Sequence, residues 1–266
     1  MYDLHLHSDL SYDSKENAEN YIKIARKKGN VCIGFAEHYD LDRCLDPHEK
    51  EAPALADLKK YPETISLLRE KYADVKILKG LELGWSRAAL PYYRKIIDEN
   101  DFDYAILSVH AADGRGDCYF PAYFEGRDRK EAYSEYLGLV AESVTSELDY
   151  QIVGHLGYVA RYAPYGNKRL VYDEFPYLFD IILKEIIERG KCLELNTSCA
   201  GEKFVTDVSI IKRYIELGGR YFSFGSDAHS VEKLGYGYDE AVCFLKENGI
   251  NFICGFEKKK IIEEKI

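Results

Sequence analysis

Residues 2–7 of the chain have the sequence YDLHLH, in which one apolar residue separates His5 from His7. Residues i and i+2 of a β-strand lie on the same face, so both imidazoles can point toward one metal ion. The stretch YFSFGSDAH at 221–229 repeats this arrangement, because its apolar run ends in Asp227 and His229. Either pair alone is weak evidence, since paired histidines in a surface or a core are more common. Because both pairs occur in one chain, we next ask whether the other predicted strands also end in possible metal ligands.

Short apolar or β-branched runs between these two stretches predict further strands. The predicted strands cover 2–7, 31–37, 75–83, 104–110, 151–155, 191–196 and 221–226. Helical spacing of apolar residues alternates with them, at 18–28, from near Pro62 to 72, and at 92–99, 129–147, 173–189, 208–217 and 232–248. Strands and helices in repeated alternation indicate parallel strands joined by crossover helices.

Polar side chains occur at or just past the C-terminal end of each predicted strand. They are His7, His38, Glu82, His110, His155, Asn196 and Asp227. In a parallel barrel all these ends converge on one face, whereas an open doubly wound sheet brings together only the strands near its switch point. The placement favours an α/β barrel with its active site at the C-terminal ends of the strands. The segment 250–254 is either an eighth strand or a closing extension.

The composition describes one soluble globular domain, expected to span 1–266, because no linker or long charge block divides the chain. No apolar run is long enough to cross a bilayer, and the N-terminus lacks the layout of a secretory signal, so we expect a cytoplasmic location. The seven cysteines form no C-x-x-C pair, which favours reduced and mostly buried thiols. The net charge of -10 argues against a nucleic-acid partner. The oligomeric state stays open.

Three residues in apolar strand contexts are candidate ligands. Glu82 lies in ILKGLEL, where an unpaired carboxylate would be costly. A salt bridge to a lysine or arginine is the alternative, but a carboxylate bridging two metal ions fits better. His110 in ILSVH and His155 in IVGH are each consistent with a hydrogen-bonded core histidine, and jointly they favour metal binding.

The remaining candidates carry less signal. Asp13 lies in the loop before the first helix, and its spacing leaves a ligand and a helix N-terminal acid equally open. In the pair Glu37-His38, His38 is the expected ligand, and Glu37 either supports the ligands or forms an ion pair. His48 lies off the pattern and is expected to be solvated.

The candidate ligands are nitrogen and oxygen atoms without cysteine, a mixture that suits Zn²⁺, Mn²⁺ or Fe²⁺ better than Mg²⁺ or Ca²⁺. Several such ions can lower the pKa of a bridging water and bind the oxygens of a phosphoryl group. Three divalent ions against Glu82, Asp13 and Asp227 would leave about three positive charges, which would attract a phosphate to an acidic protein.

Taken together, the motifs resemble the polymerase-and-histidinol-phosphatase (PHP) superfamily over nearly the whole chain. They are His5-x-His7, Glu37-His38, Gly-Leu-Glu82, Ser-Val-His110, Gly-His155 and Ser-Asp227-Ala-His229. Three stretches are similar to the monofunctional histidinol-phosphate phosphatases. They are SVH, which ends at His110, IVGHL around His155, and LELNTS around Asn196. The resemblance implies a distorted seven-stranded (β/α) barrel with three divalent metal ions.

The resemblance also implies which residues bind each ion. The first ion would be held by His5, His7, Glu82 and Asp227. Glu82 would bridge to the second ion, which His110 and His155 complete. Asp13, His38 and His229 would hold the third. The chain departs from the family pattern at Glu37-His38, where Asp-His is commoner, and at Asp13, where some relatives have histidine.

The implied reaction is hydrolysis of L-histidinol phosphate to L-histidinol and phosphate, a step of histidine biosynthesis. A hydroxide bridging the first two ions would attack phosphorus, and Asp227 or His229 would relay a proton to the leaving oxygen. Arg161, six residues beyond His155, is the candidate for binding the phosphate, against the alternative of a solvated loop arginine. Lys168 and Arg169 have weaker claims.

Other functions remain open at this point. A nuclease or nucleotide phosphoesterase would keep the metal centre, but the acidic composition counts against long nucleic acids. A non-catalytic metal-binding module would have lost several ligands, whereas all nine positions here carry suitable residues. An amidohydrolase-type barrel uses a strand lysine where this chain has Glu82. The loops 39–61, 111–127 and 161–172 are long enough to determine substrate specificity.

Overall fold

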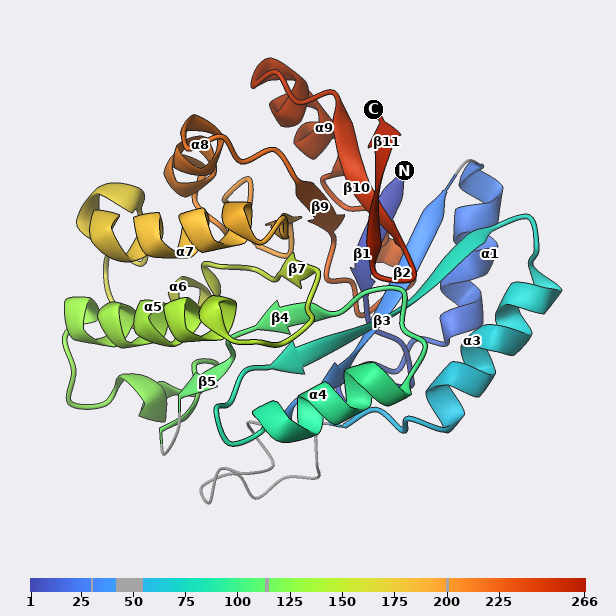
Figure 1. Cartoon of the computed structure of the whole chain (residues 1–266), viewed down its shortest axis with the longest axis horizontal. Helices are drawn as coiled ribbons and strands as arrows, with labels where there is room; N and C mark the ends of the chain where they lie inside the picture. Colours follow the sequence, from blue (N-terminus) through green and yellow to red (C-terminus); the bar gives the residue numbers. More distant parts are fainter. Residues whose placement is uncertain (30, 42–54, 113–114, 200) are drawn as a thin grey trace.

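The structure is a computed structural model that describes residues 1–29, 31–41, 55–112, 115–199 and 201–266. Its centre is a sheet of parallel strands in the order β1-β2-β3-β4-β7-β8-β9 (Figure 1). Their bounds are Tyr2–Leu6, Cys32–Tyr39, Lys76–Gly84, Ile106–Ser108, Ile152–Val153, Cys192–Asn196 and Phe222–Gly225. The two edges meet where Leu6 and Ala228 form a parallel bridge. The predicted (β/α)7 barrel is therefore confirmed, in a nearly closed form.

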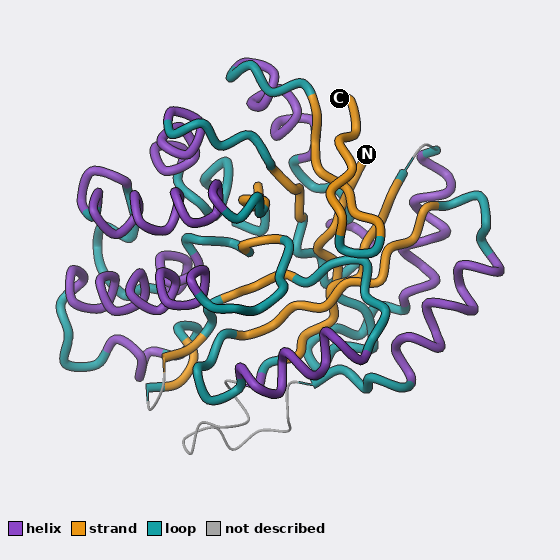
Figure 2. Tube along the Cα trace, in the orientation of Figure 1, coloured by secondary structure: helices purple, strands orange, loops and turns teal. Residues whose placement is uncertain are grey.

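Helices surround the strands (Figure 2). They are α1 Ala18–Lys28, α3 Lys60–Lys71, α4 Leu90–Glu99, α5 Arg129–Thr145, α6 Tyr158–Tyr162, α7 Pro176–Glu188, α8 Val208–Glu216 and α9 Tyr238–Glu247. Local signals fix their ends. The side chain of Asn17 caps α1 by accepting a hydrogen bond from the Glu19 amide, and Gly29, with φ of 69°, follows its last turn. Asp128 and Glu131 form a capping box at the start of α5.

Two predicted helices begin later than expected. The helix predicted at 232–248 starts at Tyr238, because Gly235 and Gly237 have φ of 69° and 74° and interrupt the helical path. The helix predicted at 173–189 starts at Pro176, which occupies its first turn after a 3₁₀ turn over Tyr172–Glu174. A further 3₁₀ turn, Val231–Lys233, occupies the start of the 232–248 segment, and another covers Pro121–Phe124.

Several short elements were not predicted. The strands β5 (Ala111–Ala112) and β6 (Gly116–Asp117) form an antiparallel pair in the loop after β4, and α6 begins the loop after β7. The segment 250–254 belongs largely to β10 (Phe252–Glu257), which pairs antiparallel with β11 (Lys260–Lys265). This hairpin is separate from the seven-stranded sheet, so the segment is not an eighth strand.

Tyr104 closes the interior of the barrel at the N-terminal ends of the strands. Its hydroxyl donates to the carbonyl of Leu4 at 2.7 Å, and its ring stacks on Phe256 of β10. Gly34 and Gly80 make room for the ring, since a Cβ at either would lie within 2.3 Å of an atom of Tyr104. Apolar residues thus fill one end of the barrel, and the polar strand ends lie at the other.

The described cysteines are all free thiols, and four of the six are buried, as expected; Cys44 lies outside the described residues. Among the described helices, none has the length and apolar character needed to cross a membrane.

Candidate metal centre

Glu82, a buried carboxylate in β3, lies at the middle of a histidine cluster. Its strand runs between β2 and β4, in register with His38 on one side and Ile106 on the other. Imidazole nitrogens lie 2.9 to 3.5 Å from its two oxygens, and they belong to His5, His7, His38, His110 and His155. The carboxylate predicted to bridge two ions therefore has histidines from both proposed ion sites around it.

Asp227 and Asp13 extend the cluster on the side of the first strand. Oδ1 of Asp227 lies 3.4 Å from Nε2 of His7. Asp227 has a φ of 51°, a left-handed conformation that aspartate adopts more readily than most residues, and it turns the chain directly after β9. Oδ2 of Asp13 lies 3.0 Å from Nε2 of His229 and 3.4 Å from Nε2 of His38.

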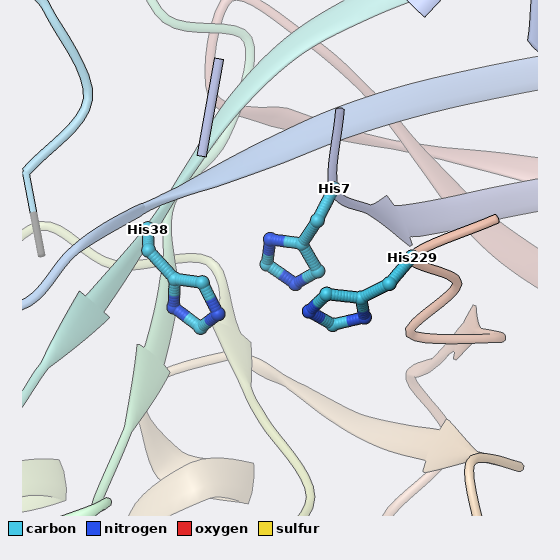
Figure 3. Close-up of side chains that lie close together, drawn as sticks. All are labelled: His7, His38 and His229. Carbon is cyan, nitrogen blue, oxygen red and sulfur yellow. The ribbon is translucent and has the colours of Figure 1, made fainter. Parts of the chain in front are cut away.

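Figure 3 shows three of these histidines pointing into a common space from different parts of the chain. The His7 ring centroid lies 4.2 Å from that of His38 and 4.5 Å from that of His229. Ligand atoms also come together in the sets His5–His7–Asp227, His5–Glu82–His155 and His38–Asp40–His110. The structure thus gathers all nine predicted ligand positions into one cluster, although their binding roles remain predictions.

Unpartnered polar atoms test whether this cluster suits cations. Nε2 of His5, Nε2 of His7 and Oε2 of Glu82 are buried and form no hydrogen bond within the described residues, although the two nitrogens lie 3.2 Å and 3.5 Å from that oxygen. Buried lone pairs without hydrogen-bond donors are costly, and a divalent cation would satisfy them. The donor set is mixed nitrogen and oxygen, as zinc, manganese or iron prefer. The residues therefore fit bound metal ions.

The pKa values of the metal-free cluster reflect competition between burial and neighbouring charges. Burial lowers the pKa of His5, but Glu194, Glu82 and Asp227 raise it well above its usual 6.5. Burial raises the pKa of Glu82, yet the adjacent histidines hold it well below its usual value. For His7, burial and two neighbouring histidines lower the pKa to about 3. Metal binding would have to displace the proton of His5, so metal affinity should increase with pH.

Two buried carboxylates near the cluster were missed by the sequence reasoning. Glu194 accepts a hydrogen bond from Nδ1 of His5 at 2.6 Å, and Asp40 lies 3.1 Å from Nδ1 of His38 and 3.5 Å from Nδ1 of His110. Strand alternation could have found both, because Glu194 precedes Asn196 by two residues and Asp40 follows His38 by two. Their charges also make the expected excess of about three positive charges too large.

Two of the remaining strand-end residues support the neighbouring loops. Glu37 accepts hydrogen bonds from the Ser8 hydroxyl at 2.5 Å and the Ser11 hydroxyl at 2.6 Å, which ties β2 to the loop that carries Asp13. The amide oxygen of Asn196 accepts from the Ser198 hydroxyl at 2.6 Å. Neither side chain belongs to a set of close ligand atoms among the described residues.

A cavity of about 410 Å³ opens over the cluster. Arg161 lies at its edge, where Nη1 donates to the Ser198 hydroxyl at 2.9 Å and lies 3.7 Å from Oδ2 of Asp227. Two of the predicted specificity loops and α6 contribute Asp117, Tyr119, Phe120, Tyr158 and Tyr162 to its wall, and Tyr12 and Asp40 line it as well. Sequence reasoning named these loops without identifying the residues.

Lys168 and Arg169 line an adjoining cavity of about 620 Å³. Arg169 donates to Asp207 at 2.6 Å. Of the predicted cationic residues, Arg161 alone lines the cavity over the cluster within the described chain. His48 lies outside the described residues, as does most of the loop 39–61.

Comparison with known proteins gives consistent matches over most of the chain. The family described as PHP domain matches residues 3–198. A probable histidinol-phosphatase of Clostridium acetobutylicum is 31% identical over 244 residues, which cover 91% of each chain. The histidinol-phosphatase of Lactococcus lactis is 29% identical and covers 99% of this chain and 97% of its own.

A crystal structure of the histidinol phosphate phosphatase from Lactococcus lactis, complexed with zinc, L-histidinol and phosphate, superposes with a TM-score of 0.88. The two chains are 28% identical, and the match covers 98% of each. The fold of that protein is therefore reproduced here over 98% of its chain.

Proposed function

Because this chain belongs to the PHP domain family, we propose that it is a metal-dependent phosphomonoesterase that hydrolyses L-histidinol phosphate to L-histidinol and phosphate. The observation that carries the proposal is the cluster of nine side chains with nitrogen or oxygen ligand atoms, Glu82 among them, below a cavity edged by Arg161. The relative that shares the fold over 98% of this chain was solved with zinc and both products of this reaction, which supports the same substrate. The enzyme would serve histidine biosynthesis.

We assign three divalent ions, zinc in the first place with manganese or iron as alternatives. His5, His7, Glu82 and Asp227 would hold the first ion. Glu82, His110 and His155 would hold the second, and Asp13, His38 and His229 the third. Bound ions would activate a water molecule and stabilise the negative charge on the phosphoryl oxygens.

The protein's own groups contribute binding and proton transfer. Arg161 can place two N–H groups against phosphate oxygens, because its guanidinium edges the cavity near Asp227. Asp227 and His229 are the candidates for delivering a proton to the leaving alkoxide, since both line the same cavity. Half-buried His229 is accessible to a substrate, and buried Glu82 is better suited to holding the centre together.

The cavity wall suits a leaving group that is both aromatic and cationic. Tyr119, Phe120 and Tyr162 line the cavity with aromatic rings, against which an imidazole can pack. Asp117 contributes a carboxylate, and the hydroxyl of Tyr158 donates to it at 3.1 Å. L-Histidinol carries an imidazole and an ammonium group, so both its features have complementary partners here.

The remaining assignments follow from the sequence. We propose that residues 1–266 act as a single domain in the cytoplasm, on a small phosphorylated substrate, without a nucleic-acid partner. The chain's net charge of -10 supports the last point.

A phosphate-release assay on zinc-reconstituted protein tests the substrate. It compares L-histidinol phosphate with p-nitrophenyl phosphate, a nucleoside monophosphate and short single-stranded DNA. We expect kcat/KM for L-histidinol phosphate to be at least about a hundredfold higher, equivalent to about 2.7 kcal/mol of differential transition-state binding. Equal or faster turnover of nucleotides would reject the histidinol phosphate assignment and favour a nucleotide phosphoesterase. Zinc-loaded protein without turnover of any substrate would indicate a non-catalytic module.

A further inference from the structure

Glu194 connects two predicted metal ligands that lie on different strands. Its Oε1 accepts a hydrogen bond from Nδ1 of His5 at 2.6 Å, and its Oε2 accepts one from the backbone amide of His155 at 2.7 Å. The amide group of Asn196 donates to Oε2 as well, at 3.2 Å. The Glu194 side chain is only 1% exposed. One buried carboxylate therefore holds both a ring from β1 and the backbone at the end of β7.

Gly225 makes this connection possible. Glu194 lies on β8 and His5 on β1, and β9 runs between these strands. A Cβ at position 225 would lie 2.2 Å from Oε1 of Glu194 and 2.6 Å from Cβ of His5. The carboxylate therefore reaches across β9 at the one kind of residue that leaves space for it.

The hydrogen bond determines which nitrogen of His5 faces the cluster. A carboxylate accepts and does not donate, so Nδ1 of His5 carries a hydrogen and Nε2 is the atom available to a metal. Nε2 lies 3.2 Å from Oε2 of Glu82 and 4.0 Å from Oδ1 of Asp227. His155 is directed to the same carboxylate, with its Nε2 2.9 Å from Oε1 of Glu82.

We propose that Glu194 is a positioning residue of the metal centre, which fixes the tautomer of His5 and the backbone of His155 so that both imidazoles aim at Glu82. The assignment rests on the proposed metal-dependent function. Hydrogen bonds from outer carboxylates to ligating histidines typically account for 10- to 100-fold in metal affinity. Replacing a buried, paired carboxylate also changes stability, so the role of Glu194 has to be measured directly as metal binding.

The test measures zinc affinity of purified full-length protein by competition with a chelator, without substrate. Glu194→Gln should lower zinc affinity about 10- to 100-fold, because an amide cannot accept from both His5 and the His155 amide. Glu194→Asp should lower it similarly, since aspartate keeps the charge but is too short to reach both groups. This second variant decides the matter if E194Q does not fold. Zinc affinity equal to that of the unmodified protein in both variants would overturn the proposal.

Two further readouts separate positioning from general stability. Long-range ¹H–¹⁵N spectra of the zinc-loaded protein should show His5 with a hydrogen on Nδ1 and none on Nε2, and E194Q should show a mixture of the two tautomers. Asp103→Asn is the control, because Asp103 accepts hydrogen bonds from the Lys79 amide and from Arg69 and lies away from the predicted ligands. D103N should keep zinc affinity within about twofold. An equal loss in D103N, or an unchanged His5 spectrum in E194Q, would overturn the proposal.

The outcome is distinguishable from failure of the function itself. An unmodified chain that takes up no zinc would reject the metal centre, and with it the role of Glu194. An unmodified chain that binds zinc but does not hydrolyse L-histidinol phosphate would reject the substrate alone, and the affinity of E194Q would still decide the positioning role.

Discussion

Nε2 of His155 lies 2.9 Å from Oε1 of Glu82, although His155 follows β7 and Glu82 lies on β3, with β4 between these two strands. The other oxygen of Glu82 faces His5, which belongs to the first strand. One carboxylate thus stands between histidines from both sides of the barrel. This geometry is what a bridging ligand requires, and it makes Glu82 the residue whose loss should affect the most ligands.

Glu82→Gln should therefore reduce both metal content and catalysis. We expect kcat/KM to fall by about 10³ or more, which corresponds to roughly 4 kcal/mol of lost transition-state stabilisation, and zinc content to fall by at least one ion per chain. Elemental analysis after dialysis and the phosphate-release assay measure the two effects. Glu142→Gln, at an exposed pair with Arg87, is the control and should match the unmodified protein. Full zinc content in E82Q would contradict the bridging role.

Arg161→Ala should raise KM for phosphomonoesters about 10- to 100-fold while zinc content stays the same, because a charged bidentate contact to phosphate is lost. Arg161→Lys should give an intermediate KM, since it keeps the charge and loses the planar fork. Arg115→Ala removes an exposed arginine that bonds Glu135, and it should have no effect. Unchanged kinetics in R161A would exclude Arg161 from substrate binding.

Asp13→Ala should reduce the zinc stoichiometry from three ions per chain to two. Asp13 contacts His229 and His38, and in the metal-free protein hydrogen bonds from these histidines outweigh burial and lower its pKa below the usual range. Asp9→Ala, in the same loop but facing Asn17, serves as the control. Retention of three ions by D13A would show that the third site does not depend on Asp13.

Two glycine-to-alanine substitutions should change stability in opposite directions. Gly80→Ala places a methyl group 2.3 Å from the ring of Tyr104, and overpacking of this kind costs typically about 1–3 kcal/mol. Gly138→Ala lies within α5 at an exposed position with no atom within 4 Å, and it should stabilise the protein by about 0.5–1 kcal/mol. Urea unfolding monitored by circular dichroism measures both. A stable G80A would mean that Tyr104 can leave the barrel interior.

Asp180 gives a pH dependence that is independent of metal. Arg213 forms two hydrogen bonds of 2.9 Å with it, joining α7 to α8, and this pairing lowers the pKa of Asp180 from 3.8 to about 2. A lowered folded-state pKa means that the contribution is present above pH 4 and is lost as the pH falls from about 4 to about 2. Asp180→Asn should therefore lower the urea midpoint at pH 7 and have a smaller effect at pH 3. An equal effect at both pH values would contradict the pairing.

Sequence alone was sufficient for the barrel because its strands are separated by helices and end in polar residues. The seven predicted strands are all present, and residues as distant as His5 and His229 were placed on one face by topology alone. Strand alternation is a strong constraint in such a fold, since it follows from backbone geometry. Strand alternation could have placed Glu194 and Asp40 on the same face as the ligands. The sequence does not show whether such a carboxylate binds a metal ion or only supports a residue that does.

The conformations of the loops could not be predicted from the sequence. Whether Gly235 and Gly237 interrupt a helix depends on left-handed dihedral angles that the preceding helical pattern does not reveal. The position of Arg161 could be anticipated from its distance to His155, whereas the aromatic wall around Tyr119 depends on the small β5–β6 hairpin, whose strands have two residues each. Such short elements are stabilised by tertiary contacts, so local patterns do not encode them.

The barrel closes between its first strand and the residues that follow its last, where Leu6 meets Ala228. His5 and His7 lie on one side of this junction, and Asp227 and His229 lie on the other. Ions bound as proposed would therefore link the N-terminal strand to a segment that is synthesised much later. During translation, the first ion site could not be completed until residue 227 had left the ribosome.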